Sequence, residues 1–246
     1  MSSGIDAIQL DRINYHIRDH VILKDLSLRV TEQSYFAIAG INGAGKSTLI
    51  KLVLDLIRQT GGEEIKIFGR SNLDPESRLQ LAYLPEKFDV KKTVTGWQYL
   101  RFVSAMYHHS LDKKYLKLLT QQLDFDELRL ADKISTYSKG MIQKLGLISC
   151  FMLKKRLLIL DEPLSGLDPR ARYHFKQLLL QQKQTGLTIF YSTHLLADAA
   201  EICDQFGILH DGGMAFIGTP AECCTQYQAD SLEQAYMKCI SEGVKE

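Results

Sequence analysis

Several features of membrane, secreted and metal-binding proteins are missing from the 246-residue sequence. No apolar run approaches the roughly 20 residues that a membrane-spanning helix needs. The first residues, MSSGIDAIQLDR, show no basic segment followed by an apolar core, so we expect no secretory signal. No CxxC pair or metal-ligand spacing occurs either, which predicts free thiols in a reducing compartment for the five cysteines Cys150, Cys203, Cys223, Cys224 and Cys239.

Internal repeats, low-complexity segments and Pro- or Gly-rich linkers are also absent from the sequence. The length therefore suits one domain with a subdomain. The formal net charge is +1, which gives no global field that would attract nucleic acid.

Hydrophobic patterning divides the chain into three parts. Residues 7–16 and 24–30 alternate between apolar and polar side chains, so the first third is predicted to be rich in strands. From about 95 to 151 the periodicity becomes helical, which predicts an inserted helical subdomain. Strands and helices then alternate, as in a parallel sheet covered on both faces. We expect a hairpin over 206–218 and a short closing helix at about 230–241.

The segment GINGAGKST, residues 40–48, matches the phosphate-loop pattern G-x-x-x-x-G-K-[ST] between a predicted strand and a predicted helix. Glycines let the backbone curl so that its N–H groups approach phosphate oxygens. Lys46 is expected to reach the β- and γ-phosphates and Ser47 to ligate Mg²⁺. The predicted nucleotide-binding residues are Gly40, Asn42, Gly43, Ala44, Gly45, Lys46, Ser47 and Thr48. A chance Gly-rich turn is the competing interpretation, and the motif alone does not separate a kinase, a GTPase or a motor.

Two carboxylates end the apolar segment LLILDEP, residues 157–163. Neighbouring side chains at a strand end point in different directions, so the two can take different roles. Asp161 is predicted to hold Mg²⁺ through water, and Glu162 to polarise an attacking water. The alternative is that Glu162 is a solvated residue at the end of the strand.

Five motifs in order make roughly residues 7–218 resemble the nucleotide-binding domain of ATP-binding cassette (ABC) transporters. They are GINGAGKST at 40–48, YSKGM at 137–141, LLILDEP at 157–163, SGLD at 165–168 and STH at 192–194. The resemblance implies a single ABC ATPase domain over 1–246 that uses ATP and Mg²⁺. The implied fold class is α/β: a P-loop NTPase with a parallel core sheet, an N-terminal antiparallel β subdomain and the inserted helical subdomain.

The resemblance also implies roles for single residues. Tyr15 matches the aromatic that stacks on adenine, although a tyrosine in a strand is often only part of a core or a surface. Asp168 matches the D-loop residue that crosses to a partner subunit. His194 joins Glu162 as the second catalytic residue, at a strand end where an α/β sheet binds ligands. A purely structural histidine is the alternative there.

The stretch YSKGM occupies the position of the family's signature motif. Ser138, Lys139 and Gly140 would then contact the ATP held by a second cassette, with the positive end of the following helix aimed at it. The alternative is an ordinary capped helix start. The family often reads LSGGQ here, so Lys139 replaces a small glycine with a cation.

A second departure places Glu86 where the family often has a glutamine. A carboxylate there brings negative charge near Mg²⁺ and phosphate, although Glu86 could also be an exposed loop residue. The predicted metal-binding residues are therefore Ser47, Asp161 and Glu86.

One cassette without a membrane span resembles a separately encoded ATPase subunit, cytoplasmic and held at the inner face of the cell membrane by a polytopic permease. A second nucleotide-binding domain completes the unit, with a homodimer favoured over a heterodimer, and no nucleic acid is expected. YLPE, YSKGM, DEPLSGLDP and SLEQAY look most like the branch that exports drugs, peptides, lipids or polysaccharides. The alternatives are a soluble ABC-type ATPase acting on ribosomes or DNA, and a P-loop kinase, which leaves STH and YSKGM unexplained.

Overall fold

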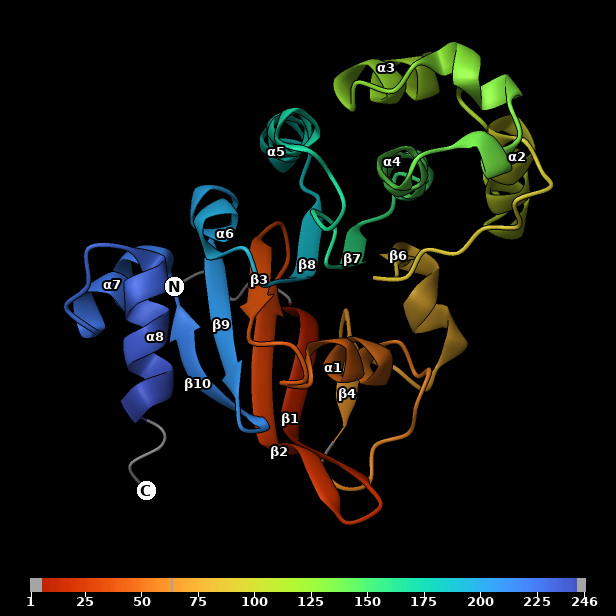
Figure 1. Ribbon diagram of the computed structural model, residues 1–246. Helices are drawn as coiled ribbons and strands as arrows, with labels where there is room; N and C mark the ends of the chain where they lie inside the picture. Colours follow the sequence, from red (N-terminus) through yellow and green to blue (C-terminus); the bar gives the residue numbers. More distant parts are fainter. Residues whose placement is uncertain (1–5, 63, 243–246) are drawn as a thin grey trace.

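A six-stranded sheet forms the centre of the protein in the computed structural model, which describes residues 6–62 and 64–242 (Figure 1). The ends of the predicted domain 1–246 lie outside the described residues. The strand order is β10-β9-β3-β8-β7-β6, and all neighbours are parallel except β10 and β9. The strands are β3 (Tyr35–Ala39), β6 (Leu81–Leu84), β7 (Leu157–Asp161), β8 (Thr188–Thr193), β9 (Gln205–His210) and β10 (Gly213–Gly218). The predicted parallel core sheet is confirmed.

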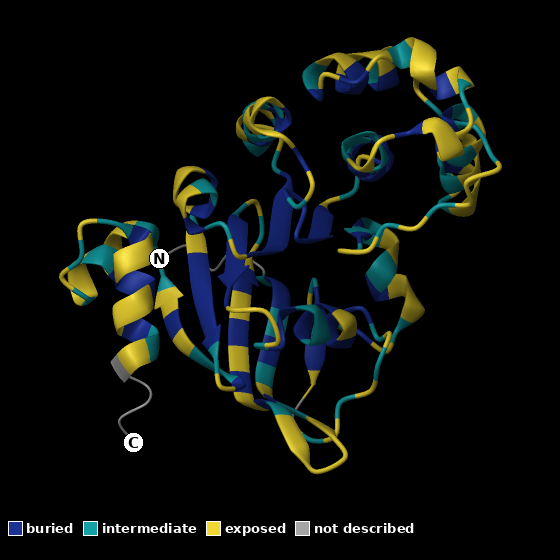
Figure 2. Ribbon diagram, in the orientation of Figure 1, coloured by how far each residue is buried: buried dark blue, intermediate teal, exposed yellow. Residues whose placement is uncertain are grey.

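Alternation along the strands produces two hydrophobic clusters, one on each face of this sheet. In β3, Tyr35 and Ala37 belong to one cluster, whereas Phe36 and Ile38 belong to the other. β7 and β8 are buried along their whole length because helices or a second sheet cover both faces (Figure 2). The first face carries α4 (Lys139–Phe151), α5 (Pro169–Lys183) and α6 (Leu196–Ile202), and the second carries α1 (Lys46–Val53).

The N-terminal strands form the predicted antiparallel sheet, in the order β2-β1-β4-β5. β1 (Asp6–Ile17) pairs with β2 (His20–Thr31) and with β4 (Ile65–Ile67), and β5 (Arg70–Ser71) closes the edge. Buried residues of this sheet, such as Ile8 and Leu28, join the same cluster as α1. The sheet therefore backs the helix that begins at the phosphate loop.

Helices fill the segment between β6 and β7, as the periodicity predicts. They are α2 (Gly96–Met106), α3 (Lys113–Gln122), the 3-10 turns η2 (Glu127–Ala131) and η3 (Ile134–Thr136), and α4. Thr95 and Gln98 form a capping box at the start of α2, and Asp112 caps α3. A further 3-10 turn, η1 (Pro75–Gln80), precedes β6.

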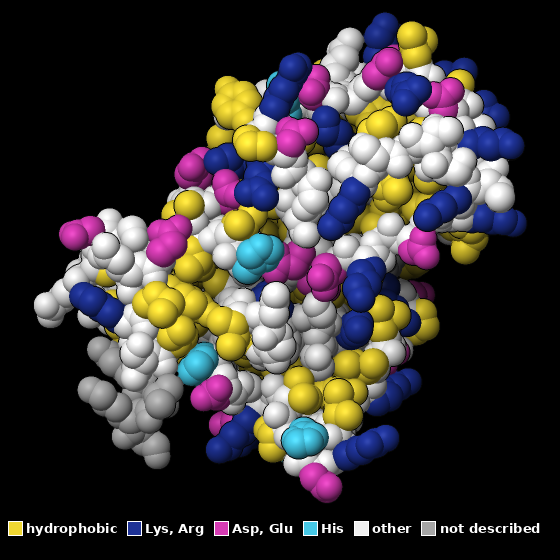
Figure 3. All heavy atoms as spheres, viewed as in Figure 1, with side chains coloured by type: hydrophobic (Ala, Val, Ile, Leu, Met, Phe, Trp, Pro, Cys, Tyr) yellow, Lys and Arg dark blue, Asp and Glu magenta, His cyan; other side chains and the backbone are white. Residues whose placement is uncertain are grey.

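The C-terminal part contains the predicted hairpin of β9 and β10, followed by α7 (Pro220–Gln226) and α8 (Leu232–Glu242). α7 was not predicted, although Thr219, Pro220 and Glu222 carry a capping box with proline at the helix start. All five cysteines are free thiols, as expected. Within the described residues no helix combines the length and the apolar character that crossing a membrane requires. Acidic and basic side chains are interspersed over the face seen in Figure 3.

Candidate nucleotide-binding site

The carboxyl ends of four parallel strands bring the predicted site residues together. Ala39 pairs with Thr193, so the phosphate loop after β3 lies beside His194 after β8. Asp161 pairs with Ser192, so the end of β7 lies on the other side of β8. Side chains that follow these strands converge because parallel strands end at the same edge of the sheet.

The phosphate loop has the shape of an anion cradle. Gly43 and Gly45 adopt left-handed backbone conformations, with φ of 89° and 105°. A side chain at Gly45 would lie 2.9 Å from Leu23 Cδ2, whereas one at Gly43 would meet only open space. No side chain of the described residues caps the start of α1, so no side-chain acceptor occupies its first N–H groups.

A chain of contacts crosses the site from the buried Lys46 through the buried Glu162 to His194, whose side chain is half exposed. The ammonium of Lys46 donates to the Gly40 carbonyl at 2.7 Å and lies 3.5 Å from Glu162 Oε1. That carboxylate oxygen is buried and has no hydrogen-bond partner among the described residues, so at 3.5 Å the contact is an ion pair only. The other oxygen, Oε2, lies 2.7 Å from His194 Nδ1.

Ser192, which the sequence analysis missed, connects the two carboxylates of LLILDEP. It is fully buried, donates to Asp161 Oδ1 at 2.5 Å and accepts the backbone N–H of Glu162 at 2.8 Å. Glu162 itself has a φ of 51°, a conformation that costs about 1–2 kcal/mol for a residue with a side chain. The signal in the sequence was a serine near the end of the segment LTIFYST, residues 187–193, where a buried hydroxyl needs partners.

Glu86 lies at the same end of the sheet, after β6. Burial raises the pKa of the nearby Tyr83 to about 12, and the negative charges of Asp161 and Glu86 add to this shift. A cavity of about 430 Å³ opens among these groups. It is lined by Ile22, Asn42, Gly43, Gly45, Lys46, Ser47, Thr48, Glu86, Glu162, Ser165 and His194. Ile22 and Ser165 had not been predicted.

Other predicted site residues lie outside this cavity. Tyr15 is half-buried and packs against the cluster around α1. Asp168 caps α5 by accepting the Ala171 N–H at 2.8 Å. Ser138 caps α4 in the same way by accepting the Met141 N–H at 3.2 Å, and Gly140 lies in the first turn of that helix. Ala44 lines an adjoining cavity with His210.

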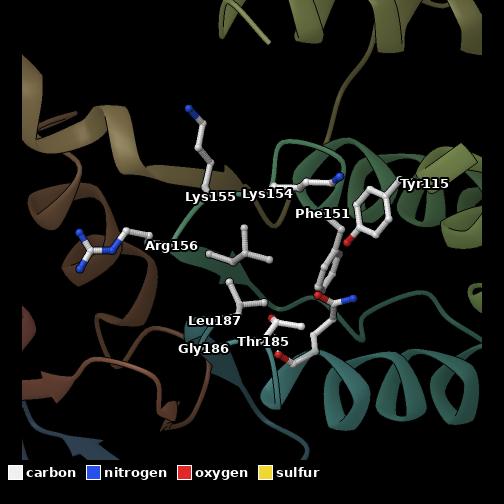
Figure 4. Close-up of a pocket in the computed structure, with 10 residues that line it drawn as sticks. Tyr115, Phe151, Lys154, Lys155, Arg156, Thr185, Gly186 and Leu187 are labelled. Carbon is white, nitrogen blue, oxygen red and sulfur yellow. Dashed lines mark hydrogen bonds between the residues drawn. The ribbon is translucent and has the colours of Figure 1, made fainter. Parts of the chain in front are cut away.

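A second cavity, of about 360 Å³, lies at the opposite, amino ends of β7 and β8 (Figure 4). Its rim includes three consecutive cations, and each has a nearby partner. Lys154 donates to Asp112 at 3.1 Å, Lys155 to the Leu79 carbonyl at 2.8 Å, and Arg156 to Glu32 at 2.7 Å. All three cations therefore already have hydrogen-bond acceptors within the protein.

The site at the carboxyl ends fits a nucleotide with a divalent cation. The open loop at Gly43 and the uncapped start of α1 suit a phosphate, and Lys46 supplies the positive charge. The buried carboxylate of Asp161, the carboxylate of Glu86 and the hydroxyl of Ser47 are hard oxygen donors of the kind that Mg²⁺ takes. Fold and site together define a P-loop nucleotide-binding protein.

Comparisons with known proteins narrow this class. A family model described as ABC transporter matches residues 23–165, more than half of the chain. An uncharacterized ABC transporter ATP-binding protein of Synechocystis is 34% identical over 206 residues, which are 81% of this chain and 57% of that relative. The linearmycin resistance ATP-binding protein LnrL of Bacillus subtilis is 29% identical over 241 residues, 96% of this chain and 76% of that relative.

A solved structure described as the ATP binding subunit of an ABC transporter superposes with a TM-score of 0.85 at 32% identity, covering 95% of this chain and 99% of that one. The chain therefore belongs to the ATP-binding family of ABC transporters, whose members bind ATP, generally with Mg²⁺. It spans little more than half the length of the Synechocystis relative.

Proposed function

We propose that this chain is one ABC ATPase domain that hydrolyses ATP and so powers translocation, in the export direction, by a separately encoded membrane permease. The observation that supports hydrolysis most directly is that the buried Glu162 carboxylate contacts both Lys46 of the phosphate loop and His194. A site for binding alone would not need a strained, buried carboxylate with one oxygen left without a hydrogen bond.

Each residue has a distinct task in this proposal. Lys46 leaves Glu162 and contacts the β- and γ-phosphates, which frees the carboxylate to accept a proton from water. His194 orients Glu162 through Nδ1 and faces the γ-phosphate. Ser47, Asp161 and Glu86 would hold Mg²⁺, which neutralises charge that develops on the phosphate oxygens. Catalysis then rests on positioning and electrostatics.

Glu162→Gln tests this assignment. The amide keeps the size of the side chain but accepts no proton, so turnover should fall about 100-fold or more while ATP affinity changes little. Steady-state phosphate release and binding of a fluorescent ATP analogue measure the two quantities. Glu201→Gln is the matched control, because its exposed carboxylate pairs with Lys176 at 2.7 Å far from the phosphate loop. Turnover of Glu162→Gln near that of the control would disprove the role of Glu162.

The signature residues Ser138, Lys139 and Gly140 are proposed to act on the ATP of a second copy, in a head-to-tail homodimer. Two observations support this: Ser138 is exposed at the start of α4, and none of the three lines the cavity of their own chain. Asp168, exposed at the start of α5, is proposed to reach the same partner.

Mixing two inactive variants tests the dimer. Ser138→Arg should bind ATP as a monomer yet hydrolyse little, because the bulky cation blocks the partner's site. Mixed with Glu162→Gln, it should regain about a quarter of wild-type turnover, since random pairing makes about half of the dimers mixed and each holds one intact site. No recovery on mixing would show that both residues serve one site in the same chain.

The proposal also includes the direction of transport, which is export, a membrane permease as partner, and a cytoplasmic position beneath the membrane. A relative named for linearmycin resistance, similar over 96% of this chain, supports export. Affinity purification of the tagged chain from solubilised membranes should recover a polytopic protein. Recovery of ribosomes or DNA in its place would contradict this part of the proposal and leave the ATPase assignment intact.

A further inference from the structure

The start of α4 is fastened to the loop that follows Glu162 in the same chain. The buried side-chain amide of Gln143, in the second turn of α4, donates to the Pro163 carbonyl at 3.0 Å. One turn earlier, a Cβ placed on Gly140 would lie 3.5 Å from the Gly166 carbonyl oxygen. Loop 163–168 thus lies along the first two turns of the helix.

Lys139 makes the third contact, and it does so with its hydrocarbon stem. A Cβ placed on Gly166 would lie 2.9 Å from Cε, 3.3 Å from Cδ and 3.4 Å from Cγ of Lys139. Gly166 also has a φ of 79°, which favours glycine there, and the stem lies over the space that a side chain at Gly166 would occupy. Lysine stems commonly cover neighbouring surface while the ammonium stays in water.

The charge of Lys139 has no comparable partner. Among the described residues Lys139 forms no ion pair, and a cation in the first turn of a helix meets the positive end of the helix dipole. The stem is therefore the part of this side chain that the fold uses. Ser165, which lines the nucleotide cavity, precedes Gly166 directly, so the covered loop reaches the site.

We propose that Lys139 is a positioning residue that holds loop 163–168, and through it Glu162 and Ser165, by the packing of its stem on Gly166. This rests on the proposed function for its effect on hydrolysis, and it adds a task for the Lys139 stem to the contact proposed between the signature residues and the partner's ATP. It also gives each chain a physical link between its signature segment and its own hydrolytic carboxylate.

Two substitutions of Lys139 separate the contribution of its hydrocarbon stem from that of its charge. Lys139→Met keeps a long apolar stem without the charge, whereas Lys139→Ala removes both and retains a strong helix former. We expect Lys139→Ala to lower kcat about tenfold, because small displacements of reacting groups are costly. Lys139→Met should turn over about fivefold faster than Lys139→Ala by the same argument. ATP affinity, measured with a fluorescent analogue, should be equal in both. The control is Lys144→Ala, also on α4, which loses a hydrogen bond to the Asp124 carbonyl. Its kcat should stay within about twofold of wild type.

Hydrogen exchange supplies a readout that does not depend on hydrolysis. Amides of loop 163–168 should exchange faster in Lys139→Ala than in Lys139→Met and wild type. Equal loss of turnover in the Met and Ala variants would show that the charge acts, and equal exchange in all three would remove the packing role; either result overturns the proposal. If the wild-type chain hydrolyses no ATP, the proposed function fails, while the exchange comparison still decides the role of Lys139.

Discussion

The two cavities at opposite ends of β7 and β8 both contain lysine side chains but differ in how their charges are paired. The amino-end cavity is lined by apolar side chains such as Phe151 and Leu158 together with three cations, whereas the carboxyl-end cavity is mostly polar, with Lys46 as its lysine. At the amino ends, each of three cations has a nearby acceptor on the protein surface. At the carboxyl ends, Lys46 and Glu162 are buried, 3.5 Å apart, and leave one carboxylate oxygen without a hydrogen bond. The number of charges therefore says little about function, and the incomplete pairing of buried charges says more.

Replacing one lysine in each cavity by alanine should give the largest difference in ATP affinity. Lys46→Ala should weaken ATP binding about 10- to 100-fold, since a hydrogen bond to a charged group contributes about 1.5–3 kcal/mol. Lys154→Ala, at the other cavity, should leave affinity within about twofold, because it loses a half-exposed ion pair with Asp112 and a cation–π contact with Tyr115. Calorimetric titration with ATP and Mg²⁺ measures both. Equal losses in the two variants would remove the distinction between the cavities.

Much of the carboxyl-end cavity could be predicted from the sequence because its residues sit in short segments tied to strand ends. GINGAGKST follows a strand of the parallel sheet, LLILDEP and STH each include the end of one, and such ends meet. Ser165 and Ile22 were not predicted as lining residues, because their positions in the cavity depend on the packing of loop 163–168 and of the antiparallel sheet. The contact of Lys139 with Gly166 escaped for the same reason: it joins residues 27 positions apart through the packing of α4.

Tyr15 lines neither cavity, so its substitution tests whether ATP binding extends beyond the carboxyl-end cavity. Its predicted stacking on adenine should make Tyr15→Leu bind ATP about tenfold more weakly and leave Tyr15→Phe near wild type, since stacking on a base is worth about 1–3 kcal/mol. Leucine keeps the packing against the cluster around α1, so loss of the ring is the main change. Competition between ATP and a fluorescent analogue gives the affinities. Wild-type affinity in Tyr15→Leu would show that the ring only packs.

Arg156 gives the smallest expected effect and concerns stability alone. Its guanidinium lies 4.4 Å from the centre of the Phe68 ring and donates to Gln80 at 2.5 Å and to Glu32 at 2.7 Å. Half of the side chain is exposed, so Arg156→Met should lower the free energy of unfolding by only about 1 kcal/mol, with turnover within about twofold. Urea unfolding and phosphate release measure the two. A loss of turnover greater than the loss of folded protein would mean that the amino ends of β7 and β8 also serve the reaction, and the contrast between the two cavities would have to be abandoned.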